Sequence, residues 1–244
     1  MCGRDWLFQC CTFSTLWCIR PILRKIPPLE IEKQLNEIRR HILSMGASVE
    51  QRVKQAVDAL AREDIELARK VRKGDIEINE FEIDIEHECL RVLALTHPVA
   101  SDLRFVMTVL RINSGLERIG DKAKSISKRV IDLGEQPHVD IPPMLMEMAD
   151  AARTMLSNAL SAMANEDIDL AISVRRADDV VDQLQKEMFA WAHSEIPQHP
   201  EFTQSYIDIL SVARALERIG DQSTNIAEDV IFLVRGDVVR HTQV

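Results

Sequence analysis

The sequence predicts an all-α protein made of two tandem three-helix bundles that arose by internal duplication. The hexapeptide Leu-Glu-Arg-Ile-Gly-Asp occurs at residues 116–121 and again at 216–221. An upstream block repeats in the same order, because 61–75 and 164–178 share Glu-Asp-Ile, Leu-Ala and Val-Arg at equal offsets. Apolar residues follow the four-three spacing of packed helices, and no stretch shows the alternation typical of a strand. Two matched blocks indicate two similar units.

Composition and charge restrict the class of protein. With 46% hydrophobic and 28% charged residues, the 244-residue chain has the balance of a soluble globular protein. Its net charge of −9 disfavours a nucleic-acid partner, because an acidic surface repels phosphate backbones. Only Cys89 of the five cysteines lies within the repeats, so the repeats form no internal disulfide and fit a reducing compartment.

Residues 1–28 form an atypical leader, rich in cysteine and aromatic residues. One hypothesis is a membrane-surface anchor with Cys10 and Cys11 as lipidation candidates. The alternative, which we prefer, is an extension outside the fold. Its apolar stretch at 6–19 is too short and too interrupted to span a bilayer, and it lacks the features of a signal peptide.

The first bundle is predicted over residues 29–135. A helix runs from 29 to about 61, and Asp64 caps a second long helix that ends at Thr96-His97-Pro98. Ser101 or Asp102 caps the third helix, which ends at Gly134. The predicted seam of the third helix contains eight apolar residues: Val109, Ile112, Leu116, Ile119, Ala123, Ile126, Val130 and Leu133.

The second bundle is predicted over residues 141–236, after a proline-rich linker. Its helices are expected at about 144–164, 168–194 and 202–235, with Gly236 as the final cap. Each bundle should therefore be slender, since a helix of about thirty residues is roughly 45 Å long.

Each hexapeptide places two carboxylates one helical turn apart. Glu117 and Asp121, like Glu217 and Asp221, stand at i and i+4 and are expected to point outward from the bundle. An outward position excludes the interior di-metal site of ferritin-like bundles. The paired charges destabilise the helix by roughly 0.2–0.5 kcal/mol and the glycine between them by about 1 kcal/mol. A bound cation would offset the repulsion, which favours a metal site.

The middle helix of each repeat supplies a second acidic pair. In the second repeat this pair is Asp178 and Asp182, and its counterparts in the first are Asp75 and Asn79. Oxygen-only ligands suit magnesium, manganese or oxidised iron better than zinc. The alternative is a solvated acidic face, which is how we interpret the stripe of Glu80, Asp84 and Glu88.

The two hexapeptides, with Pro-Val-Ala-Ser-Asp-Leu-Arg at 98–104 and Met-Gly at 45–46, resemble the PhoU family of regulators of phosphate-specific transport. The resemblance covers about residues 29–241. It implies two bundles related by a pseudo-twofold axis, with iron, zinc, magnesium or manganese bound on their surface. The implied metal ligands are Asp75, Glu117, Asp121, Asp178, Asp182, Glu217 and Asp221. Because Asn79 replaces a carboxylate, the first site is expected to bind metal more weakly.

The resemblance further implies a non-enzymatic adaptor between the ATPase subunit of a phosphate ABC transporter and a sensor histidine kinase. Such a protein is a negative regulator of phosphate-starvation genes, cytoplasmic, homodimeric, and peripheral to the membrane through its partners. Two other hypotheses remain. A metal-dependent hydrolase is disfavoured, because no His, Lys or Cys stands in register with the carboxylates as a base or nucleophile. A purely structural scaffold would carry the same acidic face without metal.

Overall fold

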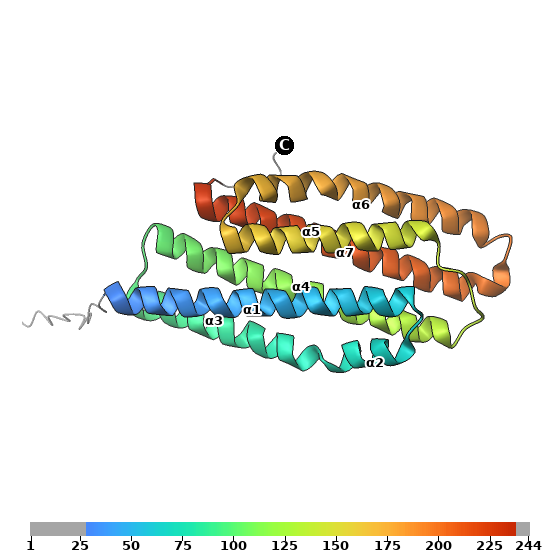
Figure 1. The fold of residues 1–244 in the computed structure, drawn as a ribbon, viewed down its shortest axis with the longest axis horizontal. Helices are drawn as coiled ribbons and strands as arrows, with labels where there is room; N and C mark the ends of the chain where they lie inside the picture. Colours follow the sequence, from blue (N-terminus) through green and yellow to red (C-terminus); the bar gives the residue numbers. More distant parts are fainter. Residues whose placement is uncertain (1–27, 238–244) are drawn as a thin grey trace, which may run out of the picture.

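The computed structural model describes the backbone of residues 28–237 and the side chains of 30–74 and 78–237. This part of the chain is helical and contains no strand, which confirms the predicted fold class. Figure 1 shows long helices lying side by side along one axis, with α1 to α4 in the first bundle and α5 to α7 in the second. The elements are α1 (Pro28–Ala61), α2 (Ile65–Lys73), α3 (Asp75–Thr96), α4 (Ser101–Gly134), α5 (Pro143–Asn165), α6 (Ile168–Glu195), η1 (Pro200–Phe202) and α7 (Thr203–Arg235).

The middle helix of the first bundle is interrupted, contrary to the prediction of one continuous helix. It divides at Gly74 into α2 and α3, whereas its counterpart α6 continues through Ala177. Glycine is about 1 kcal/mol less favourable than alanine inside a helix, which favours a break at this position. The Arg52 guanidinium fills the space beside the break, with Nη2 3.1 Å from where a Cβ on Gly74 would lie.

Two of the predicted helix caps agree with the structure and two differ from it. Asp64 caps α2 by accepting a hydrogen bond from the Leu67 amide at 2.9 Å, as predicted. Gly236 ends α7 with a φ of 80°, also as predicted, and Asp167, which was not predicted, caps α6 in the way that Asp64 caps α2. The predicted cap at Gly134 is the last residue of α4, and the cap residue is Glu135. The predicted cap of α4 at Ser101 or Asp102 is wrong. The cap residue is Ala100, at φ 49° and ψ −113°, without a side-chain hydrogen bond.

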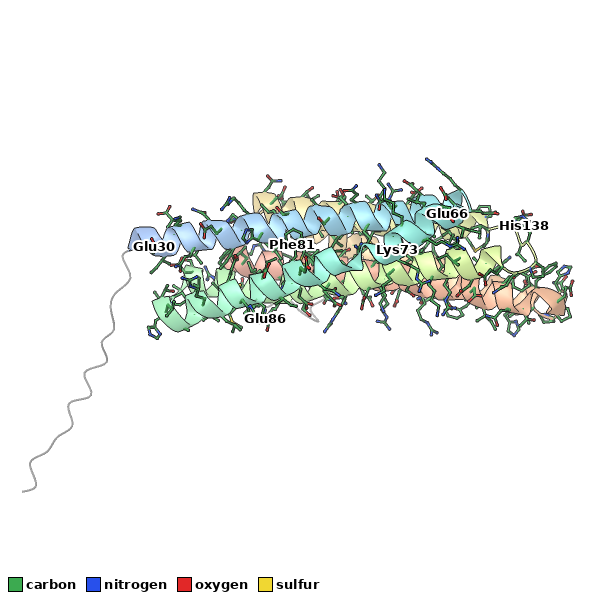
Figure 2. All side chains as sticks on the ribbon, turned by 90° about the horizontal axis from the view of Figure 1, so that it is seen from below. Glu30, Glu66, Lys73, Phe81, Glu86 and His138 are labelled. Atoms are coloured by element: carbon green, nitrogen blue, oxygen red, sulfur yellow. The ribbon has the colours of Figure 1, made fainter. Side chains whose placement is uncertain are left out.

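The predicted core is buried. All eight seam residues of α4 pack in the interior except Leu133, which is partly exposed. Burying a large aliphatic side chain contributes about 1.5–3 kcal/mol, so these seams provide most of the stability of each bundle. In Figure 2, Phe81 lies on the side of α3 toward α1, and Glu86 lies on the outer side.

The two bundles pack against each other through two helix pairs, α4 with α7 and α1 with α5. At the second contact, a Cβ on Gly46 would come within 2.8 Å of Leu160 Cδ2. Gly46 therefore allows the close approach of α1 and α5. The helices α4 and α7, which carry the two hexapeptides, run antiparallel along the centre of the molecule.

Among residues 28–237, no helix is both long enough and apolar enough to cross a membrane. The predictions made for the leader, including its two lipidation candidates, lie outside the described residues apart from residue 28.

Candidate metal centre

The second bundle brings four of the predicted carboxylates together. Asp178 and Asp182 come from α6, and Glu217 and Asp221 come from the adjacent turn of α7. Burial, followed by the nearby charges of Asp221 and Asp182, raises the pKa of Asp178 to about 6, while the Thr224 hydroxyl acts in the opposite direction. Burial and Asp221 likewise raise the pKa of Glu217. We call these four residues the second acidic cluster.

Arg218 partly neutralises the second acidic cluster from within the hexapeptide itself. Its Nη1 lies 2.8 Å from Asp221 Oδ2, and its Nε lies 3.4 Å from Glu217 Oε2. Glu217 is only 15% exposed, so the prediction that it points outward is wrong in part. The reason is that α6 packs alongside this face of α7, so a position beside the seam becomes half-covered.

The first bundle forms a similar group with a member that the sequence analysis missed. Burial raises the pKa of Glu117 most, followed by the charges of Asp121 and Glu82. Burial also raises the pKa of Glu82, with further contributions from Glu86 and Asp121. Glu82 therefore lies close to the first hexapeptide. We call Glu82, Glu117 and Asp121 the first acidic cluster.

A signal for Glu82 was present in the sequence. Residues 75, 79, 82 and 86 follow four-three-four spacing, so they share one face of the middle helix. Glu82 supplies a carboxylate where the second repeat has Gln185, and Asn79 stands where the second repeat has Asp182. The charge deficit expected at Asn79 is thus offset, and weaker metal binding by the first bundle no longer follows. The side chain of Asp75 lies outside the described residues.

The glycine of each hexapeptide allows helices to pack closely. A Cβ on Gly120 would lie 3.1 Å from Ile78 Cδ1, and one on Gly220 would lie 3.5 Å from both Asp178 Oδ1 and Val181 Cγ1. From the sequence, the cost of this glycine is interpreted as a sign of a bound cation. The group that approaches the glycine is instead the neighbouring middle helix, so the glycine does not by itself indicate a ligand.

The carboxylates supply the right chemistry for a hard cation but are not arranged around one. Among the described side chains, no three His, Cys, Asp or Glu residues are positioned to hold a metal ion. Carboxylate oxygens suit magnesium, manganese and iron. In the second acidic cluster, a cation would take the place that Arg218 now occupies beside Asp221, and the side chains would have to turn toward it.

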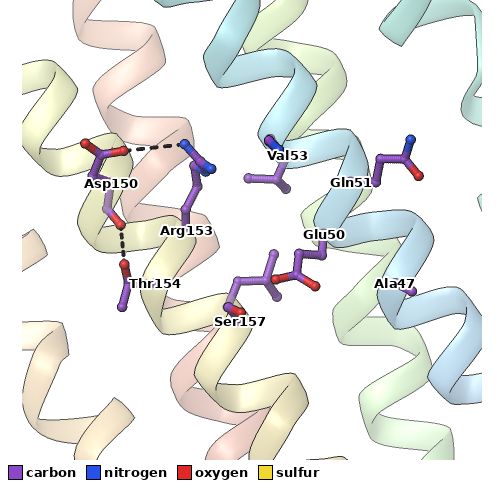
Figure 3. Close-up of a pocket in the computed structure, with 10 residues that line it drawn as sticks. Ala47, Glu50, Gln51, Val53, Asp150, Arg153, Thr154 and Ser157 are labelled. Carbon is purple, nitrogen blue, oxygen red and sulfur yellow. Dashed lines mark hydrogen bonds and ion pairs between the residues drawn. The ribbon is translucent and has the colours of Figure 1, made fainter.

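A hollow away from both clusters lies between α1 and α5 (Figure 3). It encloses about 460 Å³ and contains none of the predicted metal ligands. Its charges balance, because Glu50 and Asp150 face Lys54 and Arg153. Arg153 and Asp150 are 3.5 Å apart on α5, and the Thr154 hydroxyl donates to the Asp150 carbonyl.

Comparison with known proteins assigns the family. The family model for the PhoU domain matches the chain twice, at residues 42–130 and 145–230. The chain belongs to the PhoU family. Each match contains one hexapeptide, so the duplication seen in the sequence is a duplication of the PhoU domain.

Curated relatives and solved structures agree with this assignment. The chain is 40% identical over 215 residues to a phosphate-specific transport system accessory protein PhoU homolog of Pseudomonas putida, covering 87% of this chain and 83% of the relative. It is 34% identical to the accessory protein PhoU of Escherichia coli, covering 87% and 88%. The crystal structure of PhoU from Pseudomonas aeruginosa superposes with a TM-score of 0.82 at 38% identity, covering 84% of this chain and 99% of that one. The regulatory protein PhoU from Streptococcus pneumoniae superposes with a TM-score of 0.76 at 31% identity, covering 86% and 99%.

Proposed function

We propose that this protein is a non-enzymatic, metal-binding regulator of phosphate uptake. In this proposal it is a cytoplasmic homodimer that links the ATPase subunit of a phosphate ABC transporter to a sensor histidine kinase. It keeps phosphate-starvation genes off while phosphate is plentiful. The observation that carries the proposal is membership of the PhoU family along most of the chain, at 34–40% identity to curated accessory proteins of phosphate-specific transport.

The acidic clusters support the metal-binding part of the proposal. Carboxylates from two neighbouring helices raise one another's pKa, so the site stores repulsion that a bound cation would relieve. Glu217 Oε2 is buried and accepts no hydrogen bond; its ionic neighbour is Arg218 Nε at 3.4 Å, whose place a cation would take. The counter-charge now comes from Arg218, which is 55% exposed and free to turn into solvent.

The chemistry of the clusters favours a regulator over an enzyme. Neither cluster, as defined above, includes a histidine or cysteine, so neither supplies an imidazole or thiolate nucleophile. Two similar acidic sites on one molecule instead suit docking to basic surfaces of partner proteins.

A complementation experiment tests the proposal. In the native host, deleting the gene should leave a phosphate-starvation reporter active in high phosphate, and the wild-type gene should restore repression. Glu217→Ala/Asp221→Ala should restore repression only partly and should carry less metal when purified. The matched control is Glu80→Ala/Asp84→Ala, an exposed acidic i, i+4 pair on α3. It should restore repression fully and keep the metal content of the wild type.

Normal repression in the deletion strain would contradict the regulatory role. Equal metal content in the wild type and in the Glu217→Ala/Asp221→Ala protein would contradict the metal site alone. The two readouts therefore separate the two parts of the proposal.

A further inference from the structure

The groove between α4 and α7 has a different character from the rest of this acidic protein. It encloses about 400 Å³ beside the first hexapeptide. Its lining combines two arginines with other hydrogen-bond donors: Arg111, Ser114 and Arg118 from α4, and Gln222 and Asn225 from α7. We call it the central groove.

The two arginines of the central groove differ in their contacts. Arg111 is held in place, since its guanidinium stacks 5.2 Å from the centre of the Phe232 ring and its Nη1 lies 3.3 Å from Asp229 Oδ1. Arg118 is exposed, and its charge lowers the pKa of the neighbouring Glu117, but its guanidinium makes no ion pair or hydrogen bond within the described part of the chain. Its counterpart in the second hexapeptide, Arg218, is paired with Asp221 at 2.8 Å. The first hexapeptide therefore leaves its arginine available.

The charge that reaches solvent in this groove is positive. Its one acidic residue, Asp229, is only 5% exposed and is already paired with Arg111. By contrast, the larger hollow between α1 and α5 has two acidic residues facing two basic ones. The central groove is thus a positively charged surface on a chain whose net charge is −9.

We propose that the central groove binds a phosphoryl anion. A guanidinium matches the oxygens of a phosphate with a planar pair of N–H donors, and such charge-assisted bonds are among the strongest available. The hydroxyl and amide groups offer additional donors, which a phosphoryl group with several acceptor oxygens uses more fully than a carboxylate does. Arg111 and Arg118 are two turns apart, or roughly 10.5 Å along the helix, a spacing that suits a chain of phosphates.

The ligand can come from two sources, orthophosphate or the phosphate chain of a nucleotide. The inference does not rest on the acidic clusters or on the proposed role in signalling. Its test therefore uses metal-free protein and measures binding in vitro. A negative result would leave the regulatory proposal standing.

Isothermal titration calorimetry of the full-length protein, dialysed against a chelator, tests the proposal with orthophosphate, ATP and citrate as probes. We expect saturable one-to-one binding of ATP or orthophosphate. Arg118→Gln should weaken this binding about tenfold or more. Arg153→Gln, which removes an arginine from the hollow between α1 and α5, should bind as tightly as the wild type. Tighter binding of ATP assigns a nucleotide, and equal or tighter binding of orthophosphate assigns the free ion.

A second measurement locates the ligand without relying on a variant. The chain has only 8 glycines, so labelling them with ¹⁵N gives a simple spectrum. The amide of Gly115, which lines the central groove, should shift on adding the bound anion, while that of Gly46 beside α5 should not. The proposal is overturned if neither anion binds saturably, if Arg118→Gln binds like the wild type, or if citrate binds as tightly as the phosphoryl anions.

Discussion

At the scale of single residues, Asp178 is the most informative member of the acidic clusters. It lies where α6 crosses the second hexapeptide, with its Oδ1 3.5 Å from where a Cβ on Gly220 would be. Partial burial and the charges of Asp221 and Asp182 favour its protonated form. The same features that make the ionised group unfavourable make it a suitable partner for a cation.

In the metal-free protein, the contribution of Asp178 to the free energy of unfolding should increase as the pH falls from 7 to 5. The pKa of Asp178 rises from its ordinary value of 3.8 to about 6 on folding. Between these values the native state holds a proton that the unfolded state lacks, so the free energy of unfolding decreases as the pH rises through 6. Asp178→Asn keeps the neutral form and should flatten this dependence. Urea unfolding in chelator at pH 5, 6 and 7 measures it.

Asp169→Asn is the matched control, since Asp169 is an exposed carboxylate on the same helix that does not shift the pKa of Asp178. It should retain the pH dependence of the wild type. If the free energy of unfolding changes equally with pH in the wild type and in Asp178→Asn, Asp178 does not hold a proton between pH 5 and 7.

At the scale of helices, the glycine of the hexapeptide sets how closely the middle and last helices of a bundle approach. The two copies differ in how tightly they are packed. A Cβ at Gly120 would press on Ile78 at 3.1 Å, while one at Gly220 would meet Asp178 and Val181 at an ordinary 3.5 Å. Identical sequence motifs thus have different local contacts, because the middle helices differ between the bundles.

Gly220→Ala should therefore raise the free energy of unfolding, by up to about 1 kcal/mol from helix propensity. Gly120→Ala should raise the free energy of unfolding by less, since Ile78 must shift to admit the methyl group and this strain offsets part of the gain in helix propensity. Urea midpoints compared at equal m-values measure both changes. A midpoint for Gly220→Ala below that of the wild type would contradict this account of the glycine.

At the scale of the whole molecule, periodicity and duplication were sufficient to predict two helical bundles. The seam residues of α4 are buried as the four-three spacing requires. Features that depend on contacts between helices were not predictable. The cap at Ala100 and the contact of Gly46 with Leu160 do not follow from periodicity, and the glycine that favours the break at Gly74 is tolerated inside helices at 120 and 220.

For the candidate site, pairs within one helix could be predicted, whereas contacts between helices could not. Residues within one helix, such as Glu217 and Asp221, could be paired from their spacing alone. Glu82 reaches the first hexapeptide only through the packing of α3 against α4, and a single sequence does not specify the register between two helices. The half-burial of Glu217 has the same origin, because α6 covers one side of α7.

The contact between the bundles contains a buried carboxylate, Asp208, that bonds to both the first bundle and the linker. Asp208 on α7 is 1% exposed and accepts hydrogen bonds from Arg129 Nη1 of α4 at 2.9 Å and from Gln136 Nε2 of the linker at 2.8 Å. It thus joins both bundles and the segment that connects them. In the first repeat the matching residue is Thr108, so this anchor belongs to only one side of the pseudo-twofold axis.

Asp208→Asn should lower the free energy of unfolding by about 1.5–3 kcal/mol. The amide has no negative charge to pair with Arg129, and its NH2 group would face the N–H donor of Arg129 or of Gln136. Asp150→Asn is the control, since its pair with Arg153 is exposed and such pairs contribute about 0–1 kcal/mol. Urea unfolding followed by circular dichroism measures both. If the two bundles form one cooperative unit, Asp208→Asn shifts a single transition to lower urea; an unchanged midpoint would show that this anchor does not stabilise their contact.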